Sequence, residues 1–200
     1  LMAKSRTGTV SAVTTLQATM RRDARHRRAT MPEQDRVAAS GRIADRIAHM
    51  PIFVRSRLIA CYLSTGSEVD TSAIILRAWR MKKRIFVPDT RGGGKLTFRE
   101  IYPDSEFATG PFGIREPIGG SVLAASLFDL VIVPVVAFDS DHHRIGMGGG
   151  YYDRTFSFLR HRKSFLKPKL VGVAFDCQKV DKIAPNPWDI RLFRIITQAA

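Results

Sequence analysis

The stretch that decides the fold reads FDLVIVPVVAFDSDHHRIGMGGGYYDR and spans Phe128–Arg154. Its first nine residues, Phe128–Val136, are almost all apolar, which predicts a strand buried inside a sheet. A loop over Ala137–Gly150 follows, with four glycines among its last five residues, and Tyr151–Arg162 is predicted to be a helix. Ligands of open α/β sheets bind at the carboxyl ends of strands, so this loop is the first candidate for a binding site.

Apolar runs and helical segments alternate on both sides of this stretch. Further helices are predicted over Leu16–Ala29, over a segment that ends near Met50, and from Thr71 through Trp79. Further strands are predicted over Leu58–Leu63, Arg84–Val87 (stopped by Pro88), Leu96–Ile101 and Leu170–Phe175, with Phe107–Pro117 irregular. This order predicts an α/β fold with a mostly parallel sheet flanked by helices in three layers. We expect a flexible N-terminal segment over 1–15 and one domain over 16–200.

The composition is that of a globular protein and includes no membrane segment. Hydrophobic residues make up 44% and charged residues 25% of the 200 residues, values typical of folded domains. No apolar run approaches the roughly 18 residues that span a bilayer. The two cysteines, Cys61 and Cys177, have no metal-type or redox spacing, which indicates a reducing compartment and predicts a cytoplasmic protein.

The charge is strongly positive, because 32 Lys and Arg residues face 18 Asp and Glu residues, for a net +14. Such an excess favours anionic partners without choosing among nucleotides, polycarboxylates and nucleic acids. The densest cluster lies within Arg21–Arg28. It is interpreted either as part of a binding site, as a nucleic-acid contact, or as the solvated face of a helix.

The glycine loop is suited to phosphate. Glycines let the backbone approach a phosphate closely, and the N–H groups of a following helix start point toward it. Arg144 and Arg154 can add charge-assisted hydrogen bonds, and Asp153 stands where a carboxylate can hold Mg²⁺. The loop lacks the Lys-Ser/Thr of a P-loop and matches only part of the dinucleotide fingerprint, so a tight structural turn is the alternative.

His142 and His143, with Asp139 and Asp141, form a second cluster in the same loop. It can be interpreted as a metal site, but no cysteine or third well-spaced ligand supports that interpretation. A solvated loop is preferred.

The run RIGMGGGYYDR, Arg144–Arg154, resembles the signature of 5-formyltetrahydrofolate cyclo-ligases (methenyltetrahydrofolate synthetases) in its bacterial form. Weaker segments follow the order of that family: Glu68–Thr71, Gly113–Pro117, Val133–Asp139, Val171–Gln178 and Trp188–Ile190. The resemblance extends over about Leu16–Thr197, which is nearly the whole chain.

The resemblance implies an ATP-dependent enzyme that also needs Mg²⁺. Members convert 5-formyltetrahydrofolate to 5,10-methenyltetrahydrofolate and release ADP and phosphate. ATP phosphorylates the formyl oxygen, N10 attacks the activated carbon, and phosphate leaves. The expected partners are ATP and 5-formyltetrahydrofolate, with or without a polyglutamate tail, and the expected state is a monomer without membrane or nucleic-acid partners.

The resemblance also implies roles for individual residues. ATP is expected at Arg21, Arg144, Gly146, Met147, Gly148, Gly149, Gly150, Tyr151 and Asp153. The folate is expected at Glu68, Phe112 and Tyr152, the metal ion at Asp153 and Asp189, and the catalytic roles at Arg144 and Tyr152. Without the family, Glu68 would be an ordinary loop residue, and Phe112 and Tyr152 would be core aromatics.

Three positions depart from the family pattern. Gln17 stands where a lysine often reaches the nucleotide, and Arg22 or Arg25 is the expected substitute. His142 replaces a glycine two residues before Arg144; if that position needs a positive φ, histidine tolerates it less well. Phe193 replaces an acid before the final strand. A relative that keeps ATP binding but has lost folate activity is therefore a further alternative.

Overall fold

The computed structural model describes residues 4–91, 93–110, 113, 115–162 and 167–199. Its α-helices are α1 (Lys4–Ala29), α2 (Glu33–His49), α3 (Pro51–Arg55), α4 (Ser72–Arg80) and α5 (Tyr151–Thr155), and its 3₁₀ turns include η2 (Ala125–Leu127), η3 (Ser157–Arg160) and η4 (Asp176–Gln178). The strands of the main sheet are β1 (Leu58–Cys61), β2 (Arg84–Asp89), β3 (Thr97–Ile101), β6 (Leu130–Pro134), β9 (Lys169–Val173) and β10 (Arg194–Ile196). The remaining strands form two small hairpins: β4 (Phe107–Thr109) with β5 (Arg115–Pro117), and β7 (Ala137–Phe138) with β8 (Arg144–Ile145).

The main sheet has six strands in the order β10-β9-β6-β1-β2-β3. Every neighbouring pair is parallel except β2 and β3, which are antiparallel. The predicted mostly parallel sheet is therefore confirmed. The central position of β6 explains why its sequence is so apolar, since all of its residues except Pro134 are fully buried.

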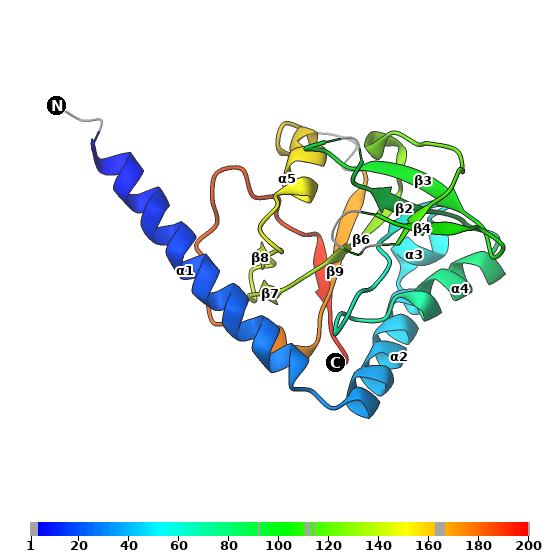
Figure 1. Ribbon diagram of the computed structural model, residues 1–200, viewed down its shortest axis with the longest axis horizontal. Coiled ribbons are helices and arrows are strands. Elements are labelled where there is room, and N and C mark those ends of the chain that lie inside the picture. Colours follow the sequence, from blue (N-terminus) through cyan, green and yellow to red (C-terminus); the bar gives the residue numbers. More distant parts are fainter. Residues whose placement is uncertain (1–3, 92, 111–112, 114, 163–166, 200) are drawn as a thin grey trace.

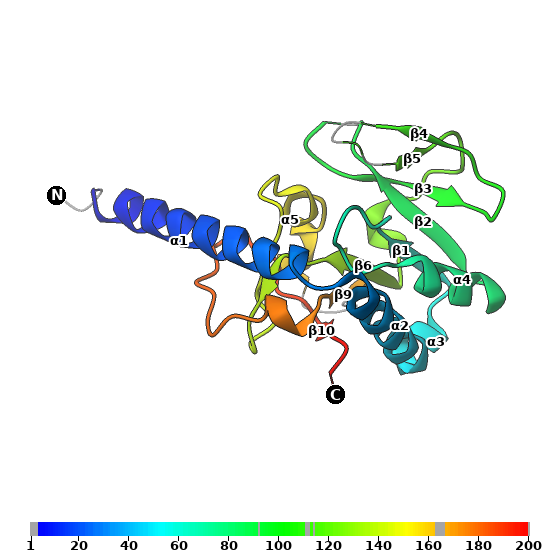
Figure 2. The ribbon, with the colours of Figure 1, turned by 60° about the horizontal axis from the view of Figure 1, so that its bottom comes forward.

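Helices cover both faces of the sheet (Figures 1 and 2). On one face, α2, α3 and α4 pack their apolar residues on β1, β6 and β9, as Ile43 and Ile47 do beside Ile59. On the other face, α5 and η3 cover a cluster of phenylalanines. The Phe128 ring lies 5.3 Å from that of Phe86 and 5.0 Å from that of Phe98, both edge to face. The three-layer prediction is confirmed.

Several predicted elements differ from those observed. Strand β2 continues through Pro88, because β1 pairs with β2 only as far as Phe86 and leaves this end with one neighbouring strand. The stretch predicted as irregular contains the β4–β5 hairpin. The helix predicted over 151–162 is α5 followed by η3. Helix α1 begins at Lys4, so the proposed boundary at residue 15 falls inside it, and the flexibility of 1–15 stays a prediction.

Strand β3, which pairs with β2, carries a buried carboxylate. Glu100 is 3% exposed and accepts two hydrogen bonds of 2.7 Å from the Arg84 guanidinium and one of 2.6 Å from the Ser121 hydroxyl. These bonds, with Arg84 contributing most, lower the pKa of Glu100 from 4.5 to about 2. The folded state therefore favours the ionised carboxylate.

Glu100 should make the protein less stable in acid. Because its folded pKa is depressed, its contribution is present above about pH 4.5 and is lost as the pH falls toward about 2. In urea unfolding between pH 5 and pH 3, Glu100→Gln should show a shallower loss of stability than the wild-type chain, although it is less stable at pH 7. Parallel pH curves for the two proteins would contradict this assignment.

Candidate active site

Helix α1 lies across the carboxyl edge of the parallel strands (Figure 1). Ala24 is fully buried in a small cluster with Val136, which lies between β6 and β7, and Ile183 from the C-terminal segment. Nearby, the Arg21 guanidinium donates a 2.7 Å hydrogen bond from Nε to the Gly146 carbonyl. The helix is thus fastened to the glycine loop by an apolar contact and a charged hydrogen bond.

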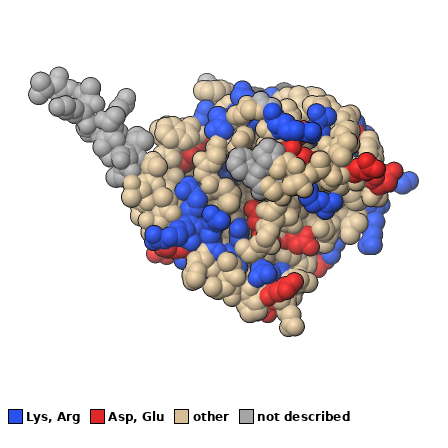
Figure 3. All heavy atoms as spheres, in the orientation of Figure 1, with Lys and Arg blue, Asp and Glu red and all other residues tan. Residues whose placement is uncertain are grey.

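A cleft of about 640 Å³ opens between α1 and the loop that follows β1. Arg21, Arg22, Arg25 and Arg28 line one side, and Glu68 and Met147 are among the residues that line the rest. In Figure 3, basic side chains gather over the C-terminal half of α1 beside this hollow. The cleft is strongly positive, because Glu68 is the one acid among its lining residues in the described chain.

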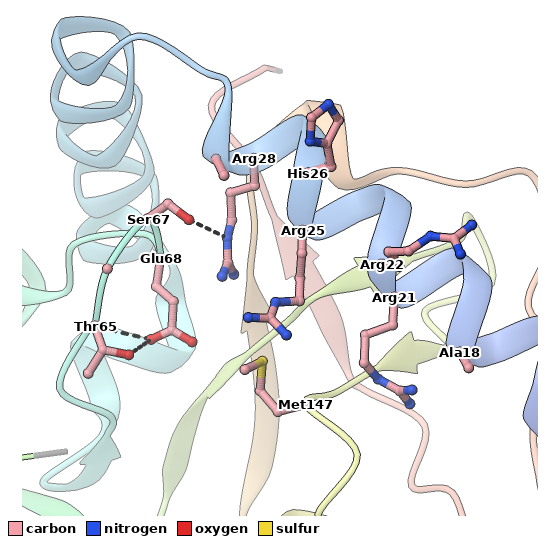
Figure 4. Close-up of a pocket in the computed structure, with 12 residues that line it drawn as sticks. Ala18, Arg21, Arg22, Arg25, His26, Arg28, Thr65, Ser67, Glu68 and Met147 are labelled. Carbon is pink, nitrogen blue, oxygen red and sulfur yellow. Dashed lines mark hydrogen bonds between the residues drawn. The ribbon is translucent and has the colours of Figure 1, made fainter. Parts of the chain in front are cut away.

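Glu68 faces the arginines of α1 from across the cleft (Figure 4). Its Oε2 accepts hydrogen bonds from the backbone N–H and the hydroxyl of Thr65, at 3.0 and 3.3 Å. Burial raises the pKa of Tyr62 and of Tyr152 far above the usual value, and the nearby charge of Glu68 adds to the rise. Both phenols therefore keep their protons and remain hydrogen-bond donors at neutral pH.

The glycine loop needs glycine at two positions. Gly148 has φ +104° and Gly150 has φ +64°, values that L side chains rarely adopt. An added Cβ at Gly148 would lie 3.7 Å from the Arg21 guanidinium carbon, so the loop passes close beneath α1. The Tyr152 ring stacks on Phe156 with the ring centroids 6.2 Å apart, which anchors the residues after the loop to the phenylalanine core.

Arg144 and Asp153 hold the loop from beneath. Arg144 is 8% exposed and donates to the Ile190 carbonyl at 2.7 Å and to Asp153 Oδ1 at 2.9 Å. The same Asp153 oxygen accepts the Ile190 N–H at 2.9 Å. Asp189, the preceding residue, accepts the backbone N–H of Asn186 at 2.8 Å through Oδ2. The two predicted metal ligands therefore lie on adjoining segments.

The predicted site residues fall into two groups. Arg21, Met147 and Glu68 line one cleft, whereas Arg144 and Asp153 lie under the glycine loop and bond to the protein. Phe112 lies outside the described residues. The basic residues of Arg21–Arg28 form one dense cluster in the sequence, but the spacing of Arg21, Arg25 and Arg28 (i, i+4, i+7) identifies the residues on one helical face. Arg27 points elsewhere and donates to the Cys177 carbonyl.

The departures from the family pattern have local explanations. The Gln17 amide donates to the Ala184 carbonyl at 2.9 Å, so α1 keeps a contact with the C-terminal segment there. His142 has φ +65°, which confirms that the position favours glycine. Phe193 is 45% exposed and receives the Lys169 ammonium over its ring, 4.9 Å from the centroid.

The preferred interpretation of the cluster of Asp139, Asp141, His142 and His143 from the sequence is a solvated loop. Asp139 is buried, so that interpretation is wrong for this residue. Its carboxylate accepts the backbone N–H groups of Asp141, His143 and Ile183 at 2.9 to 3.0 Å. Nδ1 of His143 lies 3.1 Å from Oδ2 of the same carboxylate. The ligand-type atoms of Asp139, Asp141 and His143 lie within 4.8 Å of one another, and the hydrogen bonds to Asp139 account for that closeness without a metal ion.

Fold and site together define an α/β protein with a strongly basic cleft at the carboxyl edge of its sheet, lined by helix α1, the loop that follows β1 and Met147 of the glycine loop. No described helix has the length and apolarity needed to cross a membrane.

Comparison with known proteins names the family. Residues 13–198 match the model of the 5-formyltetrahydrofolate cyclo-ligase family. The chain is 38% identical over 175 residues to the 5-formyltetrahydrofolate cyclo-ligase of Escherichia coli, covering 86% of this chain and 93% of that one. It is 36% identical to the Haemophilus influenzae enzyme of the same name, over 71% of this chain and 76% of that one.

A solved structure agrees with this assignment. The NMR structure of Aquifex aeolicus 5,10-methenyltetrahydrofolate synthetase superposes with a TM-score of 0.79 at 27% identity and covers 92% of this chain and 91% of that one. The chain therefore belongs to the 5-formyltetrahydrofolate cyclo-ligase family, as its sequence indicated, and the protein is an enzyme of the cyclo-ligase class.

His142→Gly should stabilise the protein by about 0.5–1 kcal/mol, because glycine adopts a positive φ without the steric cost borne by histidine. Thermal unfolding of the two proteins in the same buffer measures this difference. A lower melting temperature for the glycine variant would show that the imidazole makes a contact worth more than the backbone strain.

Proposed function

We propose that the cleft catalyses the ATP-dependent cyclisation of 5-formyltetrahydrofolate to 5,10-methenyltetrahydrofolate, with release of ADP and phosphate. The observation that carries the proposal is the arrangement of Arg21, the glycine loop and Glu68 around one cleft. The first two suit a triphosphate, and the third suits the N–H groups of a pterin. A reaction that joins these two substrates needs both kinds of group in one place.

ATP is proposed to bind along Gly146–Tyr151 beneath α1. The positive φ values of Gly148 and Gly150 support this, because such a backbone can turn its N–H groups toward a phosphate. Arg21 lies beside the loop and supplies a fixed positive charge. Arg144 is proposed to act chiefly by holding Asp153 and Ile190 under the loop, in addition to the phosphate contact predicted from the sequence.

Mg²⁺ fits the carboxylates of this region. Magnesium prefers oxygen ligands and is usually held by one or two carboxylates together with substrate phosphates and water. Asp153 and Asp189 use Oδ1 and Oδ2, respectively, for their hydrogen bonds, and no bond is found for the other oxygen of either residue in the described chain. These two residues would hold the ion, which would neutralise phosphate charge.

The folate is proposed to bind between Glu68 and Tyr152. The formyl oxygen on N5 is a poor leaving group until ATP phosphorylates it, after which N10 attacks the formyl carbon and the C–O bond to phosphate breaks. The chain's part is to align the two substrates and to neutralise the transferred phosphoryl group. Arg21 is proposed to supply that charge, and Tyr152, which keeps its proton, supplies a hydrogen-bond donor.

The nucleic-acid alternative is not favoured. The arginines of α1 do not form one continuous exposed surface, since Arg28 is buried and Arg27 is turned to the Cys177 carbonyl. Arg22 and Arg25 are exposed at the cleft rim and are proposed to meet the glutamate tail of the folate. A preference for polyglutamylated folate, a monomeric state and a cytoplasmic location stay predictions from the sequence.

The direct test is to mix the purified protein with ATP, Mg²⁺ and 5-formyltetrahydrofolate and to follow the absorbance of the methenyl product. Product should form only when all three are present. A protein that binds ATP but forms no product would instead be a relative that has lost folate activity.

Gly148→Ala should weaken ATP binding by about fivefold or more, because alanine at φ +104° costs on the order of 1–3 kcal/mol and the loop must change shape. Calorimetric titration with ATP measures the change. Gly41→Ala is the matched control: Gly41 lies inside α2 with no atom within 4 Å of the added Cβ. It should bind ATP normally, and equal affinities for all three proteins would remove the loop from the nucleotide site.

Glu68→Gln should raise KM for 5-formyltetrahydrofolate about tenfold or more and leave ATP affinity near that of the wild type. The amide keeps the shape of the side chain but loses the charged acceptor for pterin N–H groups. Glu106→Gln, the same substitution on an exposed residue outside the cleft, is the control. Equal losses for both ligands would indicate a disturbed fold instead of a folate contact.

A further inference from the structure

Arg28 differs from the other arginines of the cleft because it is buried. It is 6% exposed, whereas Arg22 and Arg25 on the same helix are exposed. Its Nε donates to the Ser67 hydroxyl at 3.2 Å. Within the described chain, neither Nη1 nor Nη2 of Arg28 has a hydrogen-bond partner, and Figure 4 shows this end of the side chain pointing into the cleft.

The side chain of Arg28 is largely buried, but its two Nη atoms open onto the cleft, so a ligand there can supply the acceptors that the protein does not. Burial is the main influence on Arg28 and lowers its pKa, and the charge of Glu68 is the largest influence in the opposite direction. The described residues nevertheless include no ion pair between Arg28 and Glu68, since Glu68 Oε2 bonds to Thr65 instead. Two opposite charges thus face one cleft with a gap between them.

The two charges together select the chemistry of the group that fills this gap. A carboxylate or phosphate attracted to Arg28 would be repelled by Glu68, and a cation attracted to Glu68 would be repelled by Arg28. A neutral group with an acceptor oxygen beside an N–H donor satisfies both. A cyclic amide edge has this arrangement, because its C=O accepts from the guanidinium and its N–H donates to the carboxylate.

We propose that Arg28 is a substrate-binding residue that contacts the ring carbonyl of the pterin while Glu68 accepts the adjacent ring N–H. This inference rests on the proposed folate function and adds a second recognition residue to it. It assigns Arg28 to the neutral ring of the substrate, in contrast to the exposed arginines at the rim, which suit its anionic tail.

The test compares equilibrium binding of two ligands: 5-formyltetrahydrofolate and 5-formyl-6-methyltetrahydropterin, which keeps the ring but has no benzoylglutamate tail. Arg28→Gln should weaken the binding of both by the same factor, about 10- to 100-fold. Arg27→Gln, one residue earlier and outside the cleft, is the control and should bind both ligands as the wild type does. ATP affinity and melting temperature, measured on the same samples, report whether the variant has folded.

Three other results would overturn the inference. Loss of affinity for the full folate alone would mean that Arg28 binds the glutamate tail. A loss reproduced by Ser67→Ala, which removes the Nε partner but leaves the guanidinium, would mean that Arg28 only holds the Thr65–Glu68 loop. Because binding is measured without turnover, a protein that binds the folate but forms no methenyl product would contradict the proposed activity and still test Arg28. A wild-type protein that binds neither ligand would overturn both.

Discussion

The site depends on the attachment of α1 across the carboxyl edge of the sheet, because one wall of the cleft belongs to that helix. Several contacts provide the attachment. They include the buried methyl group of Ala24 and the bonds from Arg21 to the Gly146 carbonyl, from Arg28 to Ser67, from Gln17 to the Ala184 carbonyl and from Arg27 to the Cys177 carbonyl. Two of them use arginines that also face the cleft. Changes in the helix position and in the site charge are therefore coupled.

The positive charge of the cleft is a cost to the folded protein that anionic ligands can offset. Several arginines lie close together there with one acid among them, and like charges at such separations repel. A substrate pair that carries a triphosphate and at least one glutamate relieves this repulsion and is drawn in by it. Four of the 32 Lys and Arg residues of the chain line this cleft, where the proposed chemistry needs positive charge.

The layers of the fold could be predicted from the sequence because buried strands and the glycine loop leave strong local patterns. The β4–β5 hairpin could not, since each of its strands has only three residues and shows no apolar alternation. In the site, Arg21 and Glu68 were identified as candidates through the resemblance to the family, because composition alone does not single them out. The burial of Arg28 had no local signal, because it results from the loop after β1 folding against α1.

That burial bears on how the cleft distinguishes its two substrates. Exposed arginines are screened by water and attract any anion, so they raise the rate of encounter more than they select. A desolvated arginine opposite a carboxylate acts differently, since each charge penalises ligands that satisfy only the other. Helix α1 therefore presents both kinds of arginine. Its exposed arginines at the rim and its arginine beside the glycine loop attract anions without selecting among them, whereas Arg28 forms a selective pair with Glu68 across the cleft. In the proposed arrangement, this division would let a strongly basic cleft hold ATP without ATP occupying the place of the pterin.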